Sequence, residues 1–377
     1  MITAAMTTAI GVQPAIAIHP GQANSLHLTE IPRDEPGPGQ VLIRVRQVGI
    51  CGTDRELIHG SFGSAPAGTA ALVLGHEMLG KIEAVGSDVF DFTPGELVTA
   101  TVRRPDGCPA CVAGQPDMCE WLDYTERGIV GLHGFMTESV VEDVRWVVGV
   151  PHELAHIGVL VEPLSVVEKA WRQASLIQRR FASWDPKTAL VLGAGPIGLL
   201  GTLLLRSRGL EVVTMARRPG PHLISELVEA AGARYAATQE TSIQEVAAAL
   251  PPIDLIFEAT GNAAPGFAAM EVLGNNGVLV LLSGASGPAE LTVPAAAING
   301  SLLRGNKVVA GSVNSAREDF EAGVEDLGRF ETLWPGLASR LITRHLDGLD
   351  DYPRILDNPE GDIKTVIDVD EGFRVAG

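Results

Sequence analysis

The sequence predicts an α/β protein in which a β-rich first domain is followed by a second domain with a doubly wound parallel sheet. Two observations indicate this class. The first third is rich in glycine, proline and β-branched residues, with apolar positions that alternate at period two, whereas the chain after residue 188 alternates apolar strands with helical segments. The 377 residues, 46% of them hydrophobic and 20% charged, suffice for two domains that each bury a core.

The expected elements follow this division in chain order. In the first part we expect a turn at 36–39 and strands at 24–31, 41–48, 78–85 and 135–150. A helix at 164–177 leads into the second part, whose expected strands are 189–192, 211–215, 253–258 and 277–282, with helical segments such as 225–231 between them. Residues 308–313 fit one more strand, and the tail 320–377, a helix with short strands, is expected to return to the first domain.

Net charge and the distribution of charged residues disfavour several classes of protein. With 28 Lys+Arg against 46 Asp+Glu the net charge is −18, which disfavours nucleic acid and anionic membrane surfaces as partners. The longest uncharged run, 188–205, is interrupted by glycines and indicates strand, turn and buried helix rather than a membrane span. Residues 1–10 have no basic residue before their apolar stretch, so we expect no secretory signal and a cytoplasmic protein.

A glycine-rich loop marks a candidate dinucleotide site. Gly193, Gly195 and Gly198 follow an apolar strand and open an apolar helix. In this context the first glycine makes the turn, the second admits a pyrophosphate, and the third lets helix and strand pack closely. The helix N-terminus would supply N–H groups to the phosphates. The competing interpretation is a glycine-rich turn in a structural α/β domain.

The next strand indicates which dinucleotide binds. Sites specific for NAD place an acidic residue at the end of this strand, but Glu211 stands at its start and no acid stands at its end. Arg217 and Arg218 follow the strand instead, and guanidinium groups bind phosphate well. We therefore predict NADP, with NAD use in addition left open; the alternative for the two arginines is a solvated basic turn.

Cys51 and His76 are candidate ligands of a catalytic metal. Such a zinc site takes three protein ligands and keeps one open position. Taken singly, a cysteine or histidine is more often an ordinary core residue, but together, upstream of a dinucleotide loop, the two are far more informative.

These motifs resemble the zinc-dependent medium-chain dehydrogenase/reductase superfamily over nearly the whole chain. The residues that carry this resemblance are Gly49–Asp54 (GICGTD), Gly75-His-Glu77 with Gly80, Gly86, Pro94–Val98 (PGELV) and the glycine loop. Within the superfamily the chain is most similar to the archaeal-type glucose dehydrogenases, which oxidise aldoses. The closer signature comprises Thr101–Arg104 (TVRR), Gln115–Met118 (QPDM), Glu126–Gly134 (ERGIVGLHG), Glu162–Ser165 (EPLS) with Glu168-Lys169, and Gly311–Ser315 (GSVNS).

The resemblance implies a domain plan and a set of site residues. The plan is a GroES-like catalytic domain over 1–164, a Rossmann domain over 165–305 and a segment, 306–377, that returns to the catalytic domain. Catalytic zinc would be held by Cys51 and His76, with Glu162 coordinating it directly or through water and Glu77 either a ligand or a neighbour of the ligands. Thr53 joins these four in the implied catalytic set. Sugar hydroxyls would contact Thr53, Glu77, Glu126, Glu162 and Asn314. The implied cofactor contacts are Gly193, Gly195, Pro196, Ile197, Gly198, Arg217, Arg218, Ser283, Val313 and Asn314.

Three of these positions have plainer interpretations. Glu126 could be a surface acid beside Arg127, Glu162 an acid favoured at a helix start, and Asn314 a turn residue. A cluster of carboxylates nevertheless suits a polyol, because each carboxylate can accept hydrogen bonds from two hydroxyl groups.

Cys108, Cys111 and Cys119 resemble the structural-zinc lobe of the superfamily, whose usual pattern has four cysteines. The missing cysteine falls at Pro105, which cannot be a ligand, and the adjacent Asp106 is the first candidate to replace it, ahead of Asp117 and Asp123. The alternative is a reduced, metal-free lobe held together by packing.

The predicted reaction is oxidation of an aldose, D-glucose first, at C1 to the aldono-1,5-lactone, with hydride transfer to NADP. Rival predictions are a zinc dehydrogenase for polyols, secondary alcohols or amino-acid hydroxyls, a zinc-free quinone or enoyl reductase, and a non-enzymatic nucleotide-binding protein. The second rival lacks the Cys51 and His76 pair, and the third has no need to keep it. By resemblance we expect a homodimer or homotetramer.

Overall fold

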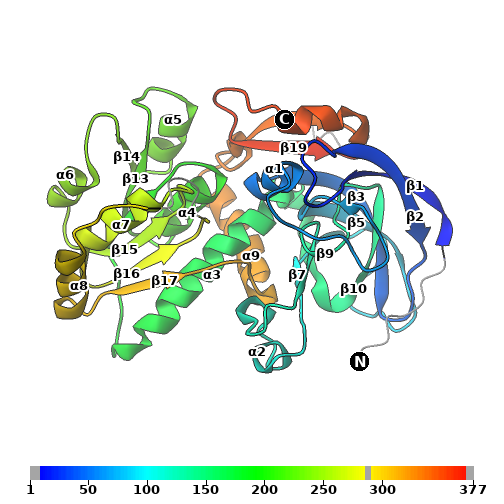
Figure 1. The fold of residues 1–377 in the computed structure, drawn as a ribbon, viewed down its shortest axis with the longest axis horizontal. Helices are drawn as coiled ribbons and strands as arrows, with labels where there is room; N and C mark the ends of the chain where they lie inside the picture. Colours follow the sequence, from blue (N-terminus) through cyan, green and yellow to red (C-terminus); the bar gives the residue numbers. More distant parts are fainter. Residues whose placement is uncertain (1–8, 285–289, 371–377) are drawn as a thin grey trace. The chain divides into compact units, whose positions relative to one another are not determined.

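The structure, a computed structural model, describes residues 9–284 and 290–370, and the chain forms two compact units (Figure 1). The first unit contains the residues up to Glu162 together with 315–327 and the residues from Leu341 on, and the second contains 163–314 and 328–340. Most of the stretch 1–10, for which no secretory signal is expected, lies outside the described residues, as do 371–377 of the returning tail.

The first unit is built on a sheet that, within the described residues, has seven strands in the order β11-β6-β5-β3-β19-β18, with β10 also paired to β3. All its strand pairs are antiparallel except β18 with β19. These strands are β3 (Gln40–Ile50), β5 (Glu77–Val85), β6 (Leu97–Ala100), β10 (Ser139–Asp143), β11 (Val147–Val150), β18 (Ile342–Asp347) and β19 (Lys364–Asp368). The central strand β3 is largely buried, because both of its edges are paired and both faces carry apolar side chains.

Among the described residues, two smaller sheets and three α-helices complete this unit. One sheet has the order β2-β1-β4 and the other β7-β8-β9. Their strands are β1 (Ala9–Ile18), β2 (His27–Asp34), β4 (Leu72–Val73), β7 (Arg103–Arg104), β8 (Thr125–Arg127) and β9 (Gly131–Leu132). The helices are α1 (Gly52–Ile58), α2 (Pro109–Val112) and the first part of α9 (Arg317–Leu333).

The second unit contains a parallel sheet with the order β14-β13-β12-β15-β16-β17 in the described residues. This is the order 3-2-1-4-5-6 of a doubly wound dinucleotide-binding domain. Its strands are β12 (Thr188–Leu192), β13 (Glu211–Ala216), β14 (Arg234–Ala237), β15 (Ile253–Glu258), β16 (Leu273–Leu281) and β17 (Val308–Gly311). Its helices are α3 (Val161–Ile177), whose first two residues belong to the first unit, α4 (Pro196–Ser207), α5 (Leu223–Ala230), α6 (Ile243–Ala248), α7 (Ala263–Val272) and α8 (Ala295–Arg304). The predicted fold class is confirmed.

Several elements differ from the sequence-based expectations. The strand expected over 135–150 is two strands separated by a 3₁₀ turn at Val144–Trp146, because the Asp143 carboxylate accepts from the N–H of Arg145 and turns the chain. The helix expected from residue 164 begins at Val161, which places Glu162 in its first turn. β1 was not anticipated. β17 belongs to the second unit although the expected boundary is at residue 305, because its backbone pairs with β16.

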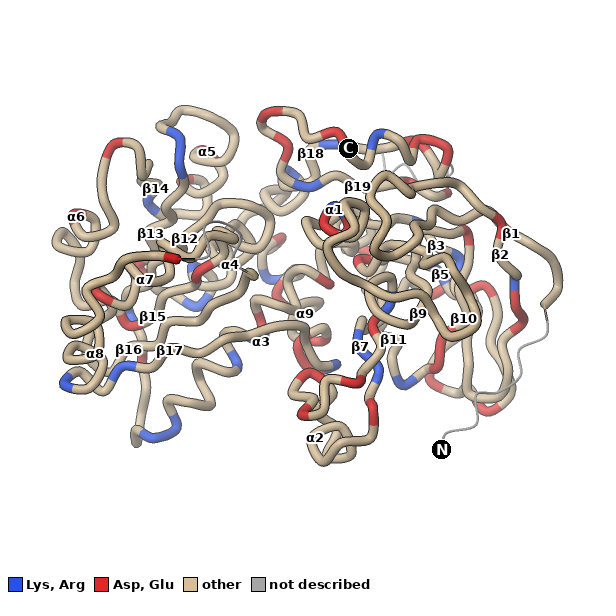
Figure 2. Tube along the Cα trace, in the orientation of Figure 1, with Lys and Arg blue, Asp and Glu red and all other residues tan. Residues whose placement is uncertain are grey.

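Short 3₁₀ helices connect several of these elements. They are η1 (Pro116–Met118), η2 (Val144–Trp146), η3 (His152–Leu154), η4 (Gly158–Leu160), η5 (Gln178–Arg180), η6 (Ser339–Leu341) and η7 (Leu349–Leu356). The run 188–205 is divided into β12, a glycine turn and α4, as expected. In the parts of the chain that the structure covers, no helix has both the length and the apolarity that crossing a membrane requires. Acidic positions are distributed over both units (Figure 2).

Candidate metal centre and dinucleotide site

Three predicted metal ligands lie together in the first unit. One donor atom each from Cys51, His76 and Glu77 lies within 4.8 Å of the other two. Cys51 is the N-cap of α1, directly after β3, and Glu77 is the first residue of β5, which pairs with β3. Strand pairing therefore brings the two motifs together. Thiolate, imidazole and carboxylate are donors that zinc accepts, so this cluster fits the metal.

Asp54 orients the cluster, although it was not among the predicted site residues. Its Oδ2 accepts a hydrogen bond of 2.9 Å from the N–H of Cys51, and its Oδ1 lies 3.5 Å from Nδ1 of His76. The carboxylate is fully buried. Burial alone lowers the pKa of His76, but Asp54 and Cys51 outweigh it and raise that pKa well above its ordinary value. A carboxylate behind one ring nitrogen leaves Nε2 for a metal, a common arrangement at zinc sites.

Glu162 and Thr53 lie beside this cluster. Glu162 is buried in the first turn of α3. Burial raises its pKa to about 7, with attraction to His76 opposing the shift and repulsion from Glu77 adding to it. These couplings indicate that Glu162 lies near the predicted ligands, but it is not one of the donors within 4.8 Å of one another. Its position also fits the plainer interpretation of a helix-start acid. The Thr53 hydroxyl lies 3.9 Å from the Cys51 sulfur.

Lys364 is a further residue of this cluster, and no sequence motif points to it. Its Nζ lies 2.7 Å from Oε1 and 2.6 Å from Oε2 of Glu77, and both side chains are almost completely buried. Lys364 opens β19, far along the chain from Glu77, and no local pattern links the two residues.

The two other predicted sugar contacts, Glu126 and Asn314, lie in different local environments. Glu126, on β8, is buried rather than on the surface, and it accepts from Nε and Nη2 of Arg103 at 3.0 and 2.9 Å. Arg103 also lies over the Tyr124 ring, at 3.7 Å from its centroid. Asn314 follows β17 in the second unit with a φ of 61°, a left-handed conformation that asparagine tolerates and that fits a turn residue.

The cysteine lobe forms a second candidate metal site. Donor atoms of Asp106, Cys108, Cys111 and Cys119 all lie within 4.8 Å of one another, and Asp117 and Asp123 are not in this group. The Cys119 thiol donates to Oδ2 of Asp106 at 2.8 Å. The Cys108 sulfur accepts from the backbone N–H groups of Cys111 and Glu120. Four donors that include three sulfurs fit a closed structural zinc site.

Ionisation within the lobe is uneven. Hydrogen bonds from Cys119 and from the backbone of Cys108 hold the pKa of Asp106 well below its usual range. Burial raises the pKa of Cys111 to about 12. Because metal binding requires thiolates, loading of this lobe must release protons.

In the second unit the glycine loop has the geometry expected of a dinucleotide site. A Cβ on Gly198 would lie 2.0 Å from the carbonyl oxygen of Gly193, so helix and strand pack too closely for any side chain. By contrast, the space beside Gly195 is open, as the approach of a pyrophosphate requires. Gly195 is the N-cap of α4, Pro196 takes the first helical position, and Ile197 follows it.

The other predicted cofactor contacts follow strands of the same sheet. Arg217 and Arg218 are exposed directly after β13, whose first residue is Glu211. Ser283, after β16, accepts from the N–H of Gly261 at 2.8 Å. The carbonyl of Val313, after β17, accepts from the buried ammonium of Lys169 at 2.9 Å. All four therefore lie beyond the carboxyl ends of their strands, where doubly wound sheets bind ligands.

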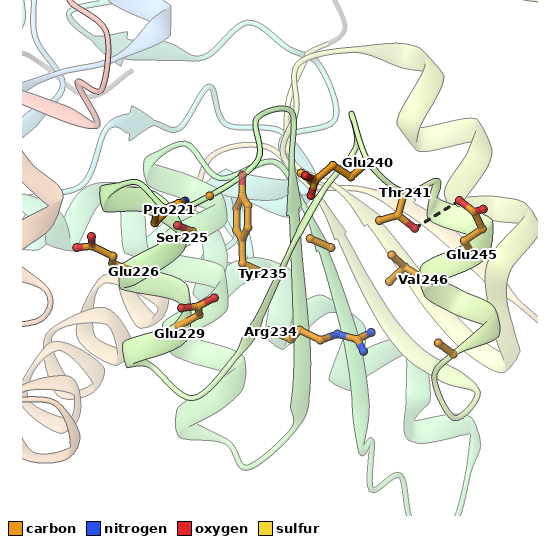
Figure 3. A pocket seen from close by; sticks show the side chains of 14 residues that line it. Pro221, Ser225, Glu226, Glu229, Arg234, Tyr235, Glu240, Thr241, Glu245 and Val246 are labelled. Carbon is orange, nitrogen blue, oxygen red and sulfur yellow. Dashed lines mark hydrogen bonds between the residues drawn. The ribbon is translucent and has the colours of Figure 1, made fainter.

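A hollow of about 590 Å³ in the second unit lies elsewhere (Figure 3). It adjoins β14, the edge strand, and its wall includes Tyr235, whose hydroxyl donates to the carbonyl of Arg218. None of the predicted site residues lines it. Its acidic lining residues are Glu226, Glu229, Glu240 and Glu245. This lining disfavours a phosphate group, so we do not place the dinucleotide there.

Comparison with known proteins agrees with this arrangement. The family described as glucose dehydrogenase C-terminus matches residues 155–369, and the alcohol dehydrogenase GroES-like domain matches residues 37–152. A glucose 1-dehydrogenase of Methanocella arvoryzae is 45% identical over 359 residues, which cover 94% of this chain and 99% of that protein. Glucose 1-dehydrogenase 1 of Haloterrigena turkmenica is 38% identical over 355 residues, covering 92% and 94%.

A solved structure gives the same result. Haloferax mediterranei glucose dehydrogenase in complex with NADP, Zn and gluconolactone has a TM-score of 0.86 and 34% identity, and the match covers 94% of this chain and 99% of that one. The fold and the two clusters thus define a zinc-dependent medium-chain dehydrogenase/reductase. Within that superfamily the chain belongs to the glucose dehydrogenase family, and the predicted resemblance is confirmed.

Proposed function

We propose that this chain oxidises an aldose, with D-glucose as the first candidate, at C1 to the aldono-1,5-lactone and passes the hydride to NADP. The observation that carries the proposal is the Cys51, His76 and Glu77 cluster, with buried Glu162 beside it, in a chain whose relatives are glucose 1-dehydrogenases. Carboxylates around the cluster suit a substrate with several hydroxyl groups, whereas a simple alcohol would favour an apolar pocket.

Each residue of the cluster has a distinct role in this proposal. Cys51 and His76 hold the zinc, and Asp54 keeps the imidazole in position. When bound, zinc supplies Lewis acidity that lowers the pKa of the C1 hydroxyl group, and NADP supplies the hydride acceptor. The Thr53 hydroxyl, near the Cys51 sulfur, holds the C1 hydroxyl group. The proton of that hydroxyl group leaves through water or through a nearby carboxylate, Glu162 or Glu77.

Remaining sugar hydroxyls bind Glu77, Glu126 and Asn314. The cofactor pyrophosphate binds at the N-terminus of α4, over Gly193, Gly195 and Gly198, with Pro196 and Ile197 in the same turn. Ser283, Val313 and Asn314 contact its nicotinamide end. Arg217 and Arg218 bind the 2′-phosphate.

The first experiment measures NADPH formation at 340 nm from D-glucose and NADP. D-galactose, D-xylose, a simple alcohol, a polyol and NAD are run in parallel, each before and after chelation. Chelator-sensitive turnover of an aldose with NADP is expected. Activity on the alcohol or the polyol alone would overturn the sugar assignment and leave a zinc dehydrogenase with another substrate.

The choice of NADP is tested separately by the double variant Arg217→Ala with Arg218→Ala. Hydrogen bonds to charged groups contribute about 1.5–3 kcal/mol, so we expect kcat/KM for NADP to fall by about 10- to 100-fold while that for NAD changes little. An unchanged NADP-to-NAD ratio would show that the two arginines form only a solvated turn.

We further propose that the lobe of Asp106, Cys108, Cys111 and Cys119 holds a structural zinc. Metal analysis should then give two zinc ions per chain; one would indicate a lobe held by packing alone.

We also propose a homodimer or homotetramer, which light scattering on the purified protein measures. The three lobe thiols favour the cytoplasm, where they stay reduced.

A further inference from the structure

The pair formed by Glu77 and Lys364 crosses a strand. Glu77 on β5 stands opposite Gly49 on β3, and on the other edge of β3 Val366 of β19 stands opposite the same glycine. The two charged side chains therefore come from the strands on either side of β3 and meet across it. A Cβ on Gly49 would lie 2.0 Å from Oε2 of Glu77. The absence of a side chain at Gly49 is what leaves room for this pair.

Both charged groups of this pair, the Lys364 ammonium and the Glu77 carboxylate, have hydrogen-bond partners. Lys364 Nζ bonds both oxygens of Glu77, at 2.7 and 2.6 Å, and donates to the carbonyl of Ile50 at 3.3 Å. The side chains of Lys364 and Glu77 are 2% and 1% exposed. Two charges taken so completely out of water are costly, and hydrophobic replacements are often at least as stable. Stability alone is therefore a weak reason for this pair to be here.

The same carboxylate also belongs to the metal cluster, since an oxygen of Glu77 lies within 4.8 Å of donor atoms of Cys51 and His76. Lys364 and a metal would thus compete for Glu77. A catalytic zinc keeps one open position for substrate, and a further permanent carboxylate ligand would fill it.

We infer that Lys364 is a positioning residue that reserves the Glu77 carboxylate and keeps it out of the resting set of zinc ligands, which is then Cys51, His76 and Glu162. This inference rests on the proposed zinc site. Gly49 contributes by leaving room for the Glu77 carboxylate to reach the Lys364 ammonium across β3. Without the ammonium, the buried Glu77 carboxylate has the metal as its nearest partner and closes the open position.

The test replaces zinc by Co²⁺, whose visible absorption reports coordination number. The variants are Lys364→Met, Lys364→Arg and the neutral pair Lys364→Met with Glu77→Gln. Cys51→Ser supplies the spectrum of the lobe alone, which is subtracted. Lys307→Met is the matched control, because Lys307 also makes a hydrogen bond, to Ser301 at 2.7 Å, but in the second unit.

For Lys364→Met we expect a weaker Co²⁺ absorption typical of a higher coordination number. We also expect slower zinc release to a chelator, because one more ligand holds the metal, and a lower kcat, because the open position is filled. The neutral pair should recover the wild-type Co²⁺ spectrum and release rate, since Glu77 can then no longer bind the metal. Lys364→Arg, which keeps the charge, and the control Lys307→Met should both resemble the wild type in these two measurements.

The neutral pair keeps the test decisive even if Lys364→Met alone does not fold, because it buries no unpaired charge. If this pair loses zinc or changes the Co²⁺ spectrum, Glu77 is a resting ligand and the inference is wrong. An unchanged spectrum in folded Lys364→Met would also overturn it. If the wild type binds no Co²⁺ beyond the lobe signal, the proposed zinc site itself fails.

Discussion

The two candidate metal clusters of the first unit are assembled in opposite ways. The lobe takes all four donors from the single segment between Asp106 and Cys119, with backbone N–H groups aimed at the Cys108 sulfur. The other cluster joins the end of β3 to the start of β5 and has Glu162 of α3 beside it. A closed, local set of ligands is suited to holding a loop in shape. A set drawn from distant segments gains neighbours such as Asp54 and Lys364 that can adjust its chemistry.

The pKa values of the acidic residues in the two clusters are shifted in opposite directions. Burial raises the pKa of Glu162 to about 7, whereas hydrogen bonds lower that of Asp106. Without metal, Glu162 therefore changes its charge near neutral pH, as buried groups at functional sites often do. Asp106 stays ionised, as a permanent ligand should.

The largest effect that separates the clusters is expected from Cys51→Ser. Loss of the catalytic metal removes several kcal/mol of transition-state stabilisation, so kcat/KM should fall by about 10³-fold or more. Metal analysis should show one zinc per chain instead of two, because the lobe is untouched. Retained turnover after chelation would refute the zinc mechanism, and loss of both metals would mean that the clusters are not independent.

A smaller and different effect is expected from Asp106→Asn. Removing the charge of one ligand should weaken zinc binding by the lobe at least about 10-fold and lower the melting temperature, with little change in kcat. Asp123→Asn is the matched control, since Asp123 is exposed and only its backbone N–H contacts Asp106. Equal effects of the two variants on zinc affinity would exclude Asp106 as a ligand.

The smallest expected effects are pH-dependent changes in the melting temperature of the metal-free protein. They have opposite signs for variants of Glu162 and of Asp106. The folded-state pKa of Glu162 is raised from 4.5 to about 7, so its ionisation disfavours the folded state. Glu162→Gln should match the wild type below pH 4.5 and melt at increasingly higher temperature than it as pH rises towards 7.

For Asp106, whose folded-state pKa is lowered from 3.8, the carboxylate stabilises the fold above that value. Metal-free Asp106→Asn should therefore melt below the wild type at pH 7, and the gap should shrink as pH falls below 3.8. Calorimetry of chelated samples between pH 3 and 8 measures both trends. Trends of the same sign in the two variants would remove the contrast between the clusters.

Sequence patterns predicted the parts of each site that are short and local. The glycine loop, the Cys51 and His76 motifs and the lobe cysteines each occur as compact motifs, and Asp106 is adjacent to the position where a cysteine was missing. The same holds for most strands, whose apolar periodicity is visible in the residues themselves. Such features depend on local backbone geometry, which neighbouring residues determine.

What the sequence did not indicate depends on long-range pairing. Lys364 meets Glu77 only because β19 pairs with β3, and the burial of Glu126 depends on Arg103 of the neighbouring strand. The break at 144–146 was missed because an Asp143 side-chain hydrogen bond outweighs an apolar pattern that would otherwise continue. β17 was expected as a strand, but its place in the second sheet is decided by the backbone of β16.

The position of β19 also has a consequence for biosynthesis. A ribosome delivers the parallel sheet of the second unit, which ends at Gly311, before it delivers Lys364. The second unit can therefore fold while the chain is still growing. On the central strand β3, made early, residues 47–50 lack their partner along one edge, and the cluster lacks Lys364, until β19 emerges. Nascent chains of this enzyme are thus expected to bind dinucleotide before they can turn over sugar.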